Sequence, residues 1–176
     1  LARASPPDGL GREAQDPNGD DVLVVRAVED AARAARRESL VRPMGRQTAG
    51  VIGMRLAADD EVIVLGVASQ GEELISVTHQ GYGKRTPLKD YPVKGRGGKG
   101  VIGHTLTKKT GLLAGAFVGS KDQDMFVISS SGIVIRVAAA DIRRVGRASQ
   151  GVRTMRVEEG ATVVALAPVI AAAELE

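Results

Sequence analysis

A short phrase of glycine, arginine and valine recurs three times in this chain at a nearly constant interval. Its glycines Gly50, Gly100 and Gly151 lie 50 and 51 residues apart, and each is followed by valine. A Gly-Arg pair precedes each of them, at Gly45-Arg46, Gly95-Arg96 and Gly146-Arg147. A period of this length suits one small β-sheet per repeat, as in propeller-like rings, and is too long for most helical solenoids. The chain is therefore expected to be a β repeat protein.

Apolar segments separated by turn signals fill the intervals between these phrases, at a spacing close to ten residues, and are expected to be strands. They are 51–56, 62–68, 74–78, 84–88, 101–106, 112–118, 125–129, 133–137, 152–157 and 162–167. Gly81 and Gly132 lie between such segments, where a tight hairpin needs the positive φ that glycine adopts without steric cost. We predict an all-β, propeller-like array of about three four-stranded blades, near residues 21–56, 57–106 and 107–169.

One segment breaks the β pattern. Residues 26–40 place four alanines among charges, contain no glycine and favour a helix by propensity, with a rebuilt hairpin as the alternative. Residues 1–20 combine turn formers with polar residues and are expected to be a loop or disordered. Residues 170–176 are expected to be an unstructured tail.

The composition limits the chemistry available to the chain. Hydrophobic residues make up 43% of the sequence but aromatic residues only 2%, so an aliphatic core is expected. Cysteine is absent, which excludes disulfides, thiol nucleophiles and cysteine-ligated zinc. No apolar run approaches the roughly 18 residues of a membrane span, and the N-terminus lacks a signal-peptide pattern. We expect a soluble, cytoplasmic chain without a membrane partner.

Positive charge is concentrated in one stretch. The whole chain has 24 Lys and Arg against 21 Asp and Glu, a formal net charge of +3, which argues only weakly for an anionic partner. Between Tyr82 and Lys109, by contrast, Asp90 is the single acidic residue. The basic residues of this stretch are Lys84, Arg85, Lys89, Lys94, Arg96, Lys99, Lys108 and Lys109. A polyanion is expected to bind here first.

The loop Lys94-Gly95-Arg96-Gly97-Gly98-Lys99-Gly100 combines four glycines with three cations. Glycines let main-chain N–H groups approach phosphate oxygens, while Arg96 and Lys99 supply charge. The corresponding loops of the other repeats, together with the basic stretch, add Arg42, Arg46, Lys84, Arg85, Lys89, Arg143, Arg144 and Arg147 to the predicted DNA-binding set. These residues predict a curved basic track that binds duplex DNA without reading its sequence and bends or wraps it.

A nucleotide site fits this loop less well. Gly95, Gly97 and Gly100 satisfy the dinucleotide pattern G-x-G-x-x-G, but residues 101–106 look like a strand instead of the helix that would hold a pyrophosphate. A Walker A motif fails because Gly100 stands where Ser or Thr should hold magnesium. No cofactor is therefore predicted for this segment.

Catalytic and metal sites are not predicted either. His79 and His104 lie in different repeats without a nearby carboxylate cluster, so surface or strand-end roles are expected for both. Tyr91 stands beside Pro92 at the basic stretch and is expected to anchor the basic loop by packing, with a direct nucleic-acid contact as the alternative. No constellation of acid, base and nucleophile points to an enzyme.

On these residues the chain resembles the C-terminal domain of bacterial DNA gyrase A, from about Asp20 to Val169. That family carries a box reading Gln-Arg-Arg-Gly-Gly-Lys-Gly. The last five residues of the loop, from Arg96 to Gly100, agree with this box, whereas Lys94 and Gly95 depart from it. The variant is similar to secondary boxes in late blades of actinobacterial gyrases. The resemblance implies a β-pinwheel, of which this chain would be a part of a six-bladed ring.

The resemblance also implies a role within a larger enzyme. The segment would bind and wrap double-stranded DNA for a type II topoisomerase, DNA gyrase, that uses ATP and magnesium to introduce negative supercoils. Its implied partners are the N-terminal domain of the gyrase A polypeptide and the gyrase B polypeptide, in an A2B2 assembly. The family's DNA-cleaving tyrosine belongs to an upstream domain, so this segment is expected to be non-catalytic. Two alternatives stay open: the corresponding C-terminal domain of topoisomerase IV, and a propeller-type scaffold for protein partners.

Overall fold

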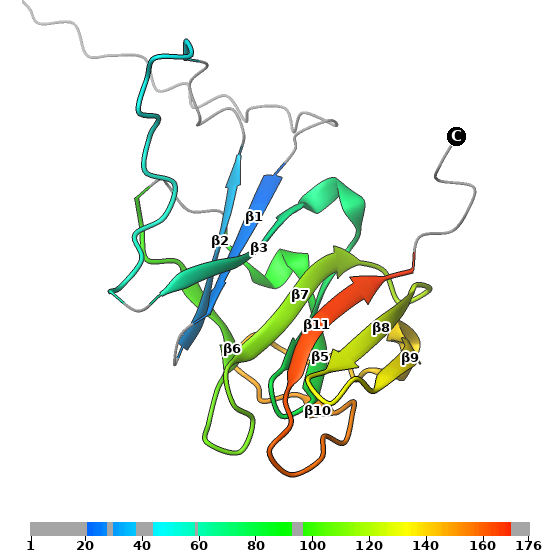
Figure 1. Ribbon diagram of the computed structural model, residues 1–176. Coiled ribbons are helices and arrows are strands. Elements are labelled where there is room, and N and C mark those ends of the chain that lie inside the picture. The colour runs from blue at the N-terminus through cyan, green and yellow to red at the C-terminus, as the bar shows by residue number, and fades with distance from the viewer. Residues whose placement is uncertain (1–20, 28–29, 38–43, 59, 93–96, 170–176) are drawn as a thin grey trace, which may run out of the picture.

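Three antiparallel sheets stand side by side in the computed structural model, which describes residues 21–27, 30–37, 44–58, 60–92 and 97–169 (Figure 1). The first sheet has the order β3 (Glu61–Val67), β1 (Asp21–Ala27), β2 (Asp30–Arg37) and β6 (Val101–Thr105). The second has the order β10 (Val152–Arg153), β5 (Tyr82–Pro87), β4 (Glu73–Thr78) and β7 (Leu113–Gly119). The third has the order β11 (Val163–Pro168), β8 (Asp124–Ser129) and β9 (Val134–Ala138). The predicted all-β class is confirmed.

Each sheet is built around one hairpin and completed by strands from further along the chain. In the second sheet the hairpin β4–β5 takes β7 beside β4 and β10 beside β5. In the first sheet β1–β2 takes β3 beside β1 and β6 beside β2 in the same way. Each of the first two sheets therefore contains strands from more than one of the blade segments predicted above, because successive repeats exchange strands.

Short 3-10 helices follow strands in all three sheets. They are η2 (Ala68–Gln70), η3 (Leu88–Asp90) and η4 (Ala139–Asp141). Of these, η3 and η4 occupy the same place after the hairpins of the second and third sheets, and each is followed directly by a large residue that is almost fully buried. These residues are Tyr91, 4% exposed, and Ile142, 1% exposed. The helices thus turn the chain inward at the end of each hairpin.

Glycine makes the predicted hairpin turns. Gly81 joins β4 to β5 with φ of +74° and donates its N–H to Thr78 O at 2.9 Å. Gly132 joins β8 to β9 with φ of +83° and donates to Ser129 O at 3.1 Å. Both turns need the left-handed region, which side chains disfavour. The predicted role of these two glycines is confirmed.

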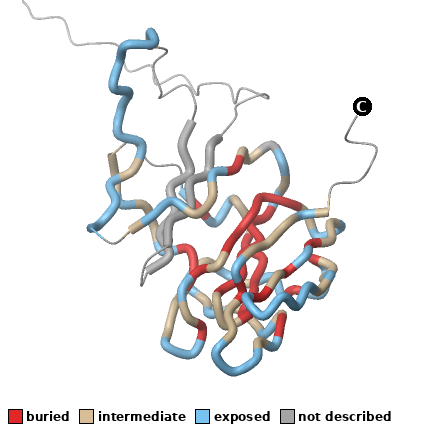
Figure 2. Tube along the Cα trace, in the orientation of Figure 1, coloured by how far each residue is buried: buried red, intermediate tan, exposed pale blue. Residues whose placement is uncertain are grey.

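Two apolar clusters pack between the sheets. The buried residues gather mainly in the strands of the second sheet (Figure 2). Every residue of β4 is buried, because the second sheet is covered on both faces. The cluster toward the third sheet contains Ile75, Val77, Phe117, Met125, Val127, Ala139, Ile142, Met155 and Val163. The cluster toward the first sheet contains Leu74, Leu113, Ala116 and Val118. With one phenylalanine among thirteen residues, these clusters confirm the predicted aliphatic core.

The helix predicted within residues 26–40 is wrong. Residues 30–37 form β2, which pairs with β1 from Asp21↔Arg37 to Val25↔Arg33 and with β6 on its other side. A strand between two neighbours satisfies its backbone N–H and C=O groups on both sides. Helix propensity differs by only tenths of a kcal/mol per residue and yields to this pairing.

Two predicted strands are shorter than expected or absent. Of the predicted strand 152–157, only Val152–Arg153 forms a strand, β10. The ladder ends there because Thr154 N and Met155 N both donate to the same acceptor, Gly81 O. The segment 51–56 is no strand, and its single ladder contact among the described residues is an isolated bridge from Met54 to Gly98. A strand requires a neighbour along its whole length, and the described residues supply none here.

Candidate nucleic-acid interface

The basic loops recur at the same corner of successive repeats. The loop before β6 lies against the preceding repeat, where Arg55 N donates to Gly98 O at 3.1 Å. The loop before β10 repeats this contact, with Thr105 N donating to Ser149 O at 3.1 Å. We call these loops, residues 97–100 and 143–150, the first and second corner loops. The sequence repeat thus places the two loops at equivalent positions on the molecule, and the described part of each contains at least one cation.

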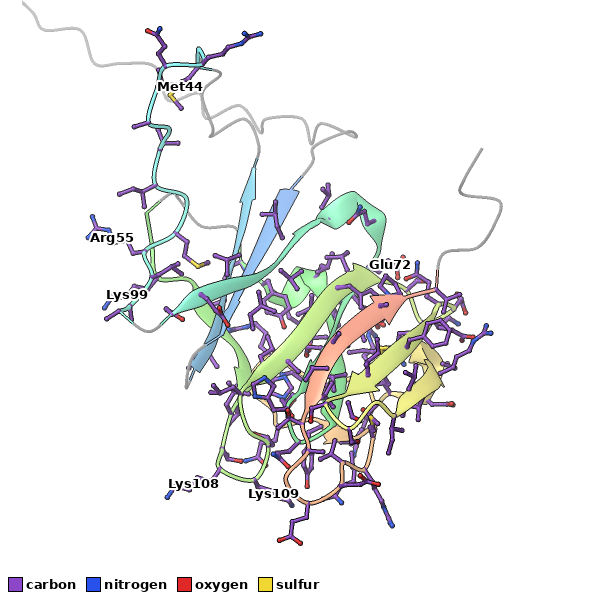
Figure 3. All side chains as sticks on the ribbon, viewed as in Figure 1. Met44, Arg55, Glu72, Lys99, Lys108 and Lys109 are labelled. Carbon is purple, nitrogen blue, oxygen red and sulfur yellow. The ribbon has the colours of Figure 1, made fainter. Side chains whose placement is uncertain are left out.

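Backbone geometry shapes the first corner loop. Gly97 and Gly100 have φ of +71° and +89°, and Gly97 N donates to Gly53 O at 3.0 Å. Lys99 is exposed and lies on the same side of the molecule as Arg55, which is also exposed (Figure 3). The predicted residues Lys94, Gly95 and Arg96, and likewise Arg42, lie outside the described residues. The strand β6 begins directly after Gly100, so the helix that a nucleotide phosphate would require is absent here.

Arginines dominate the second corner loop. Arg143 and Arg144 are exposed and Arg147 is half-buried. Arg144 Nε lies 2.7 Å from Glu73 Oε1, and Arg147 Nη1 donates to Ile102 O at 2.7 Å. Two of the three predicted arginines are therefore tethered while keeping exposed surface, which limits the side-chain entropy lost on binding an anion.

Lys84 does not present its charge to the surface, which corrects its predicted DNA contact. Its side chain is fully buried, and Nζ donates to Gly146 O at 3.2 Å, to Ser149 O at 3.0 Å and to Arg147 O. A further bond reaches Ser149 Oγ at 3.3 Å. The ammonium group therefore holds the second corner loop from inside the molecule.

Arg85 is also corrected from a DNA contact to a buried support. It is 9% exposed, and its Nη1 lies 2.6 Å from Glu73 Oε2 while Nε donates to Ile142 O at 2.8 Å. Its backbone brackets the loop, since Arg85 N donates to Arg143 O and Val145 N donates to Arg85 O. Glu73 thus links a buried arginine to Arg144 in the corner loop. The equivalent pair in the third sheet, Arg136 and Asp124, is in contact at 2.5 Å.

A neutral histidine completes this internal support. His104 is 1% exposed, and burial, followed by the nearby charge of Lys84, lowers the pKa of its imidazole to about 4. Its Nε2 donates to the carbonyl oxygen of Gln150 at 3.1 Å, because a carbonyl only accepts, and Nδ1 accepts from Ser76 Oγ at 3.2 Å. The sequence pointed to no such role, because the partners are 28 and 46 residues away.

The remaining predicted cations lie apart from these supports. Arg46 is exposed in the turn closed by Thr48 N, which donates to Gly45 O at 3.3 Å, and Lys89 is exposed in η3. Lys108 and Lys109 lie at another end of the molecule from Lys99 (Figure 3). The basic stretch 82–109 is therefore not one continuous patch, because the fold distributes its cations over separate surfaces and the interior.

One cation cluster was missed in the sequence. Arg153 Nη2 donates to the Tyr82 hydroxyl at 2.9 Å, and the Arg153 guanidinium and Lys109 Nζ lie 5.3 and 5.5 Å from the ring centre. This hydrogen bond, together with both positive charges, lowers the pKa of the Tyr82 phenol. Tyr82 and Arg153 are 71 residues apart in the chain, and the pairing of β10 with β5 brings these two together. Tyr91, in contrast, packs as predicted and donates to Gly103 O at 3.4 Å.

Other types of site find little support in the described part of the chain. There, no three His, Asp or Glu side chains gather closely enough to hold a metal ion. Within the same residues, no helix has the length and apolar character needed to cross a membrane.

Comparisons with known proteins agree with this geometry. The family described as "DNA gyrase C-terminal domain, beta-propeller" matches residues 37–69, 72–120 and 123–170. The DNA gyrase A polypeptide of Mycobacterium tuberculosis is 43% identical over 149 residues, which cover 85% of this chain and 18% of that protein. The same polypeptide of Staphylococcus aureus is 40% identical over 159 residues, covering 89% and 18%. The chain therefore spans less than a fifth of these relatives.

Solved structures show the same architecture. A DNA gyrase A C-terminal domain superposes with a TM-score of 0.76 and 22% identity, covering 86% of this chain and 51% of that one. The C-terminal domain of a DNA topoisomerase IV gives the same TM-score and identity, covering 86% and 47%. At this identity the likeness establishes the fold alone. The predicted β-pinwheel architecture is thereby confirmed.

Proposed function

Because this chain belongs to the family of DNA gyrase C-terminal domains, we propose that it binds duplex DNA on its corner loops and wraps it, as part of a gyrase A polypeptide. The observation that carries the proposal is the repeated backbone contact that sets cationic loops at equivalent corners. Contacts spaced along a series of sheets suit a long, regularly charged ligand. Duplex DNA has that form.

Phosphate contact is the expected mode of binding. Lys99, Arg143 and Arg147 would offer charge, and the open backbone around Gly97 lets a phosphate approach closely. No side chain of the corner loops is placed on a strand or helix that could enter a groove, so binding would be independent of sequence. Lys94, Gly95, Gly98, Gly100 and Arg96 complete the first loop in this proposal, and Arg42, Arg46, Lys89 and Arg144 add peripheral charge.

The same proposal extends to the complete protein of which this chain would be a part. This chain would serve a type II topoisomerase in the cytoplasm, assembled with the N-terminal part of gyrase A and with gyrase B. ATP and magnesium would act in those other parts. We propose no nucleotide site in the first corner loop, because Gly100 leads into the strand β6 instead of a helix.

Gyrase is favoured over topoisomerase IV by sequence. The relatives named above at 40–43% identity are gyrase polypeptides, whereas topoisomerase IV is matched here at the level of fold. Nothing in the described residues favours a protein scaffold instead of DNA.

The test is DNA binding as a function of salt, with single-alanine variants. Each lost phosphate contact lowers the slope of log Kobs against log salt by about one. We expect Lys99→Ala, and separately Arg143→Ala, to reduce the slope by about one and to weaken binding equally for unrelated duplex sequences. The double change at Arg96 and Lys99 should reduce it by about two.

Lys121→Ala is the matched control, because Lys121 is highly exposed in the turn before β8 and belongs to neither corner loop. Its slope should equal that of the unchanged chain. Equal slopes for all variants would remove the corner loops as the contact surface, and the absence of any DNA binding would favour the scaffold alternative.

A further inference from the structure

Two cations and a tyrosine gather on a part of the surface that the proposed DNA contacts do not use. The Tyr82 hydroxyl accepts a hydrogen bond from Arg153 Nη2 at 2.9 Å. Lys109 Nζ and the Arg153 guanidinium lie 5.5 and 5.3 Å from the centre of the Tyr82 ring. We call these three residues the tyrosine cluster. Lys109 lies at another end of the molecule from Lys99, the exposed cation of the first corner loop (Figure 3).

Strand pairing fixes two members of the tyrosine cluster. Tyr82 begins β5, Arg153 ends β10, and the two residues are direct partners in the register of these strands. The Tyr82 side chain has little freedom because the residue is only 9% exposed, whereas Arg153 is exposed. Arg153 thus uses one N–H on the phenol, and the other donors of its guanidinium remain for a ligand.

A closely bonded turn carries the third member, Lys109. Thr107 N donates to Thr110 Oγ1 at 2.9 Å, and Thr110 N donates to Thr107 O at 3.1 Å. Thr110 is fully buried, and its carbonyl oxygen accepts a hydrogen bond from Gln80 N, in the turn between β4 and β5, at 3.1 Å. The backbone of Lys109 is therefore fixed beside the hairpin turn that leads into Tyr82.

Positive charge is in excess at the tyrosine cluster. Within the part of the chain that the structure describes, neither Lys109 nor Arg153 has a carboxylate partner. Two cations that share one ring repel each other, and the ring offsets this repulsion only in part. The same surroundings lower the pKa of the Tyr82 phenol, mainly through the hydrogen bond from Arg153 and then through the charges of Arg153 and Lys109. A bound anion would relieve the repulsion.

The repeat itself does not require polar groups at these positions. Ile52 and Ile102 stand where the third repeat phrase has Arg153. After the hairpin glycine, the third sheet has Ile133 where the second sheet has Tyr82. Strand pairing therefore does not explain why a guanidinium and a phenol meet here.

We propose that Tyr82, Lys109 and Arg153 form a binding site for a phosphate group. Arg153 offers a planar fork of donors that matches two phosphate oxygens, and Lys109 adds a second charge. The Tyr82 hydroxyl accepts from Arg153 and keeps its own proton to donate. The backbone of a duplex and a free phosphate ion both present such oxygens. The site does not depend on DNA binding by the corner loops.

Nuclear magnetic resonance of the tyrosine tests this site, because the chain has only two tyrosines. In a Tyr91→Phe chain labelled with carbon-13 at tyrosine Cζ, the signal of Tyr82 reports the ionisation of its phenol. Inorganic phosphate, compared with chloride at equal ionic strength, should raise the phenol pKa toward its ordinary value, because a bound oxyanion offsets both cations. A short duplex, added instead of phosphate, provides the second arm. A rise with phosphate supports a site for the free ion, and a rise with the duplex alone supports a site for the DNA backbone.

The neighbouring lysine provides the control. Lys109→Ala, and separately Arg153→Ala, should raise the phosphate concentration that gives half of the effect about tenfold, as for the loss of one charge-assisted hydrogen bond. Lys108→Ala removes an equally exposed lysine outside the cluster and should leave this concentration unchanged, as should Lys99→Ala in the first corner loop. Circular dichroism checks that each variant is folded. A phenol pKa that neither phosphate nor duplex raises would overturn the proposal, as would equal losses in Lys108→Ala and Lys109→Ala.

Discussion

At the scale of single residues, a buried imidazole makes the stability of the molecule depend on pH. The pKa of His104 is lowered from 6.5 to about 4 in the folded chain, so the unfolded chain binds more protons between these values. Stability is therefore complete above about pH 6.5 and falls as the pH is lowered toward 4, by up to about 3 kcal/mol.

Chemical denaturation at pH 7 and pH 4.5 measures this loss. In a His104→Gln variant the loss between the two pH values should be smaller by about 2–3 kcal/mol, because the neutral amide cannot gain a proton. Carboxylates also titrate in this range, but they are common to both proteins and cancel in the comparison. Equal losses in both proteins would show that the pKa of His104 is not lowered in the folded state.

Side chains of one type divide between surface and interior in a way that the sequence does not reveal. Lys84 and Lys99 both lie in the basic stretch, and the charge pattern predicts a DNA contact for each. One is fully buried on loop carbonyls, the other is exposed. The difference arises because Lys84 stands on a strand covered on both faces, beside a loop 62 to 65 residues away. Local charge patterns contain no information about such distant partners.

At the scale of elements, the strand β5 fastens the second corner loop through Lys84. Replacing Lys84 with Met keeps the length of the side chain but leaves the carbonyls of Gly146 and Ser149 without this donor. We expect the free energy of unfolding to fall by about 1–3 kcal/mol, as for other losses of buried hydrogen bonds. The salt slope of DNA binding should stay unchanged, because the ammonium does not reach the surface. A slope lower by one at unchanged stability would return Lys84 to the DNA contacts.

Strand positions were predictable where the repeat and the apolar pattern agreed. The segments at β4, β7 and β8 were predicted within one or two residues, since their alternation and the glycine turns are local signals. The strand β2 was not predicted, because its alanines favour a helix and only pairing with β1 and β6 decides against it. The strand predicted at residues 51–56 is wrong for the opposite reason, because this strand-like sequence has no neighbouring strand among the described residues.

At the scale of the whole molecule, the stacking of the sheets determines what bound DNA must do. The second sheet is buried between the first and third, so successive corner loops follow the turn from one sheet to the next. We expect a duplex that follows the surface from one loop to the next to bend with the turn between the sheets. Bending a short duplex by 40–90° costs of the order of 1–6 kcal/mol, which contacts at a single corner would not offset. Wrapping therefore requires one duplex to contact both corner loops at once, whereas binding requires contact with only one of them.

This difference predicts how the two effects separate as salt rises. Salt weakens every phosphate contact while the bending cost stays nearly constant. Ligation of nicked circles saturated with the chain should give a positive linking-number shift that disappears at a lower salt concentration than binding itself. Arg143→Ala should lower that concentration further, and Lys121→Ala should not. A shift that persists as long as binding does would contradict cooperation between the corners. Binding without any shift would show that the corner loops hold the duplex without wrapping it.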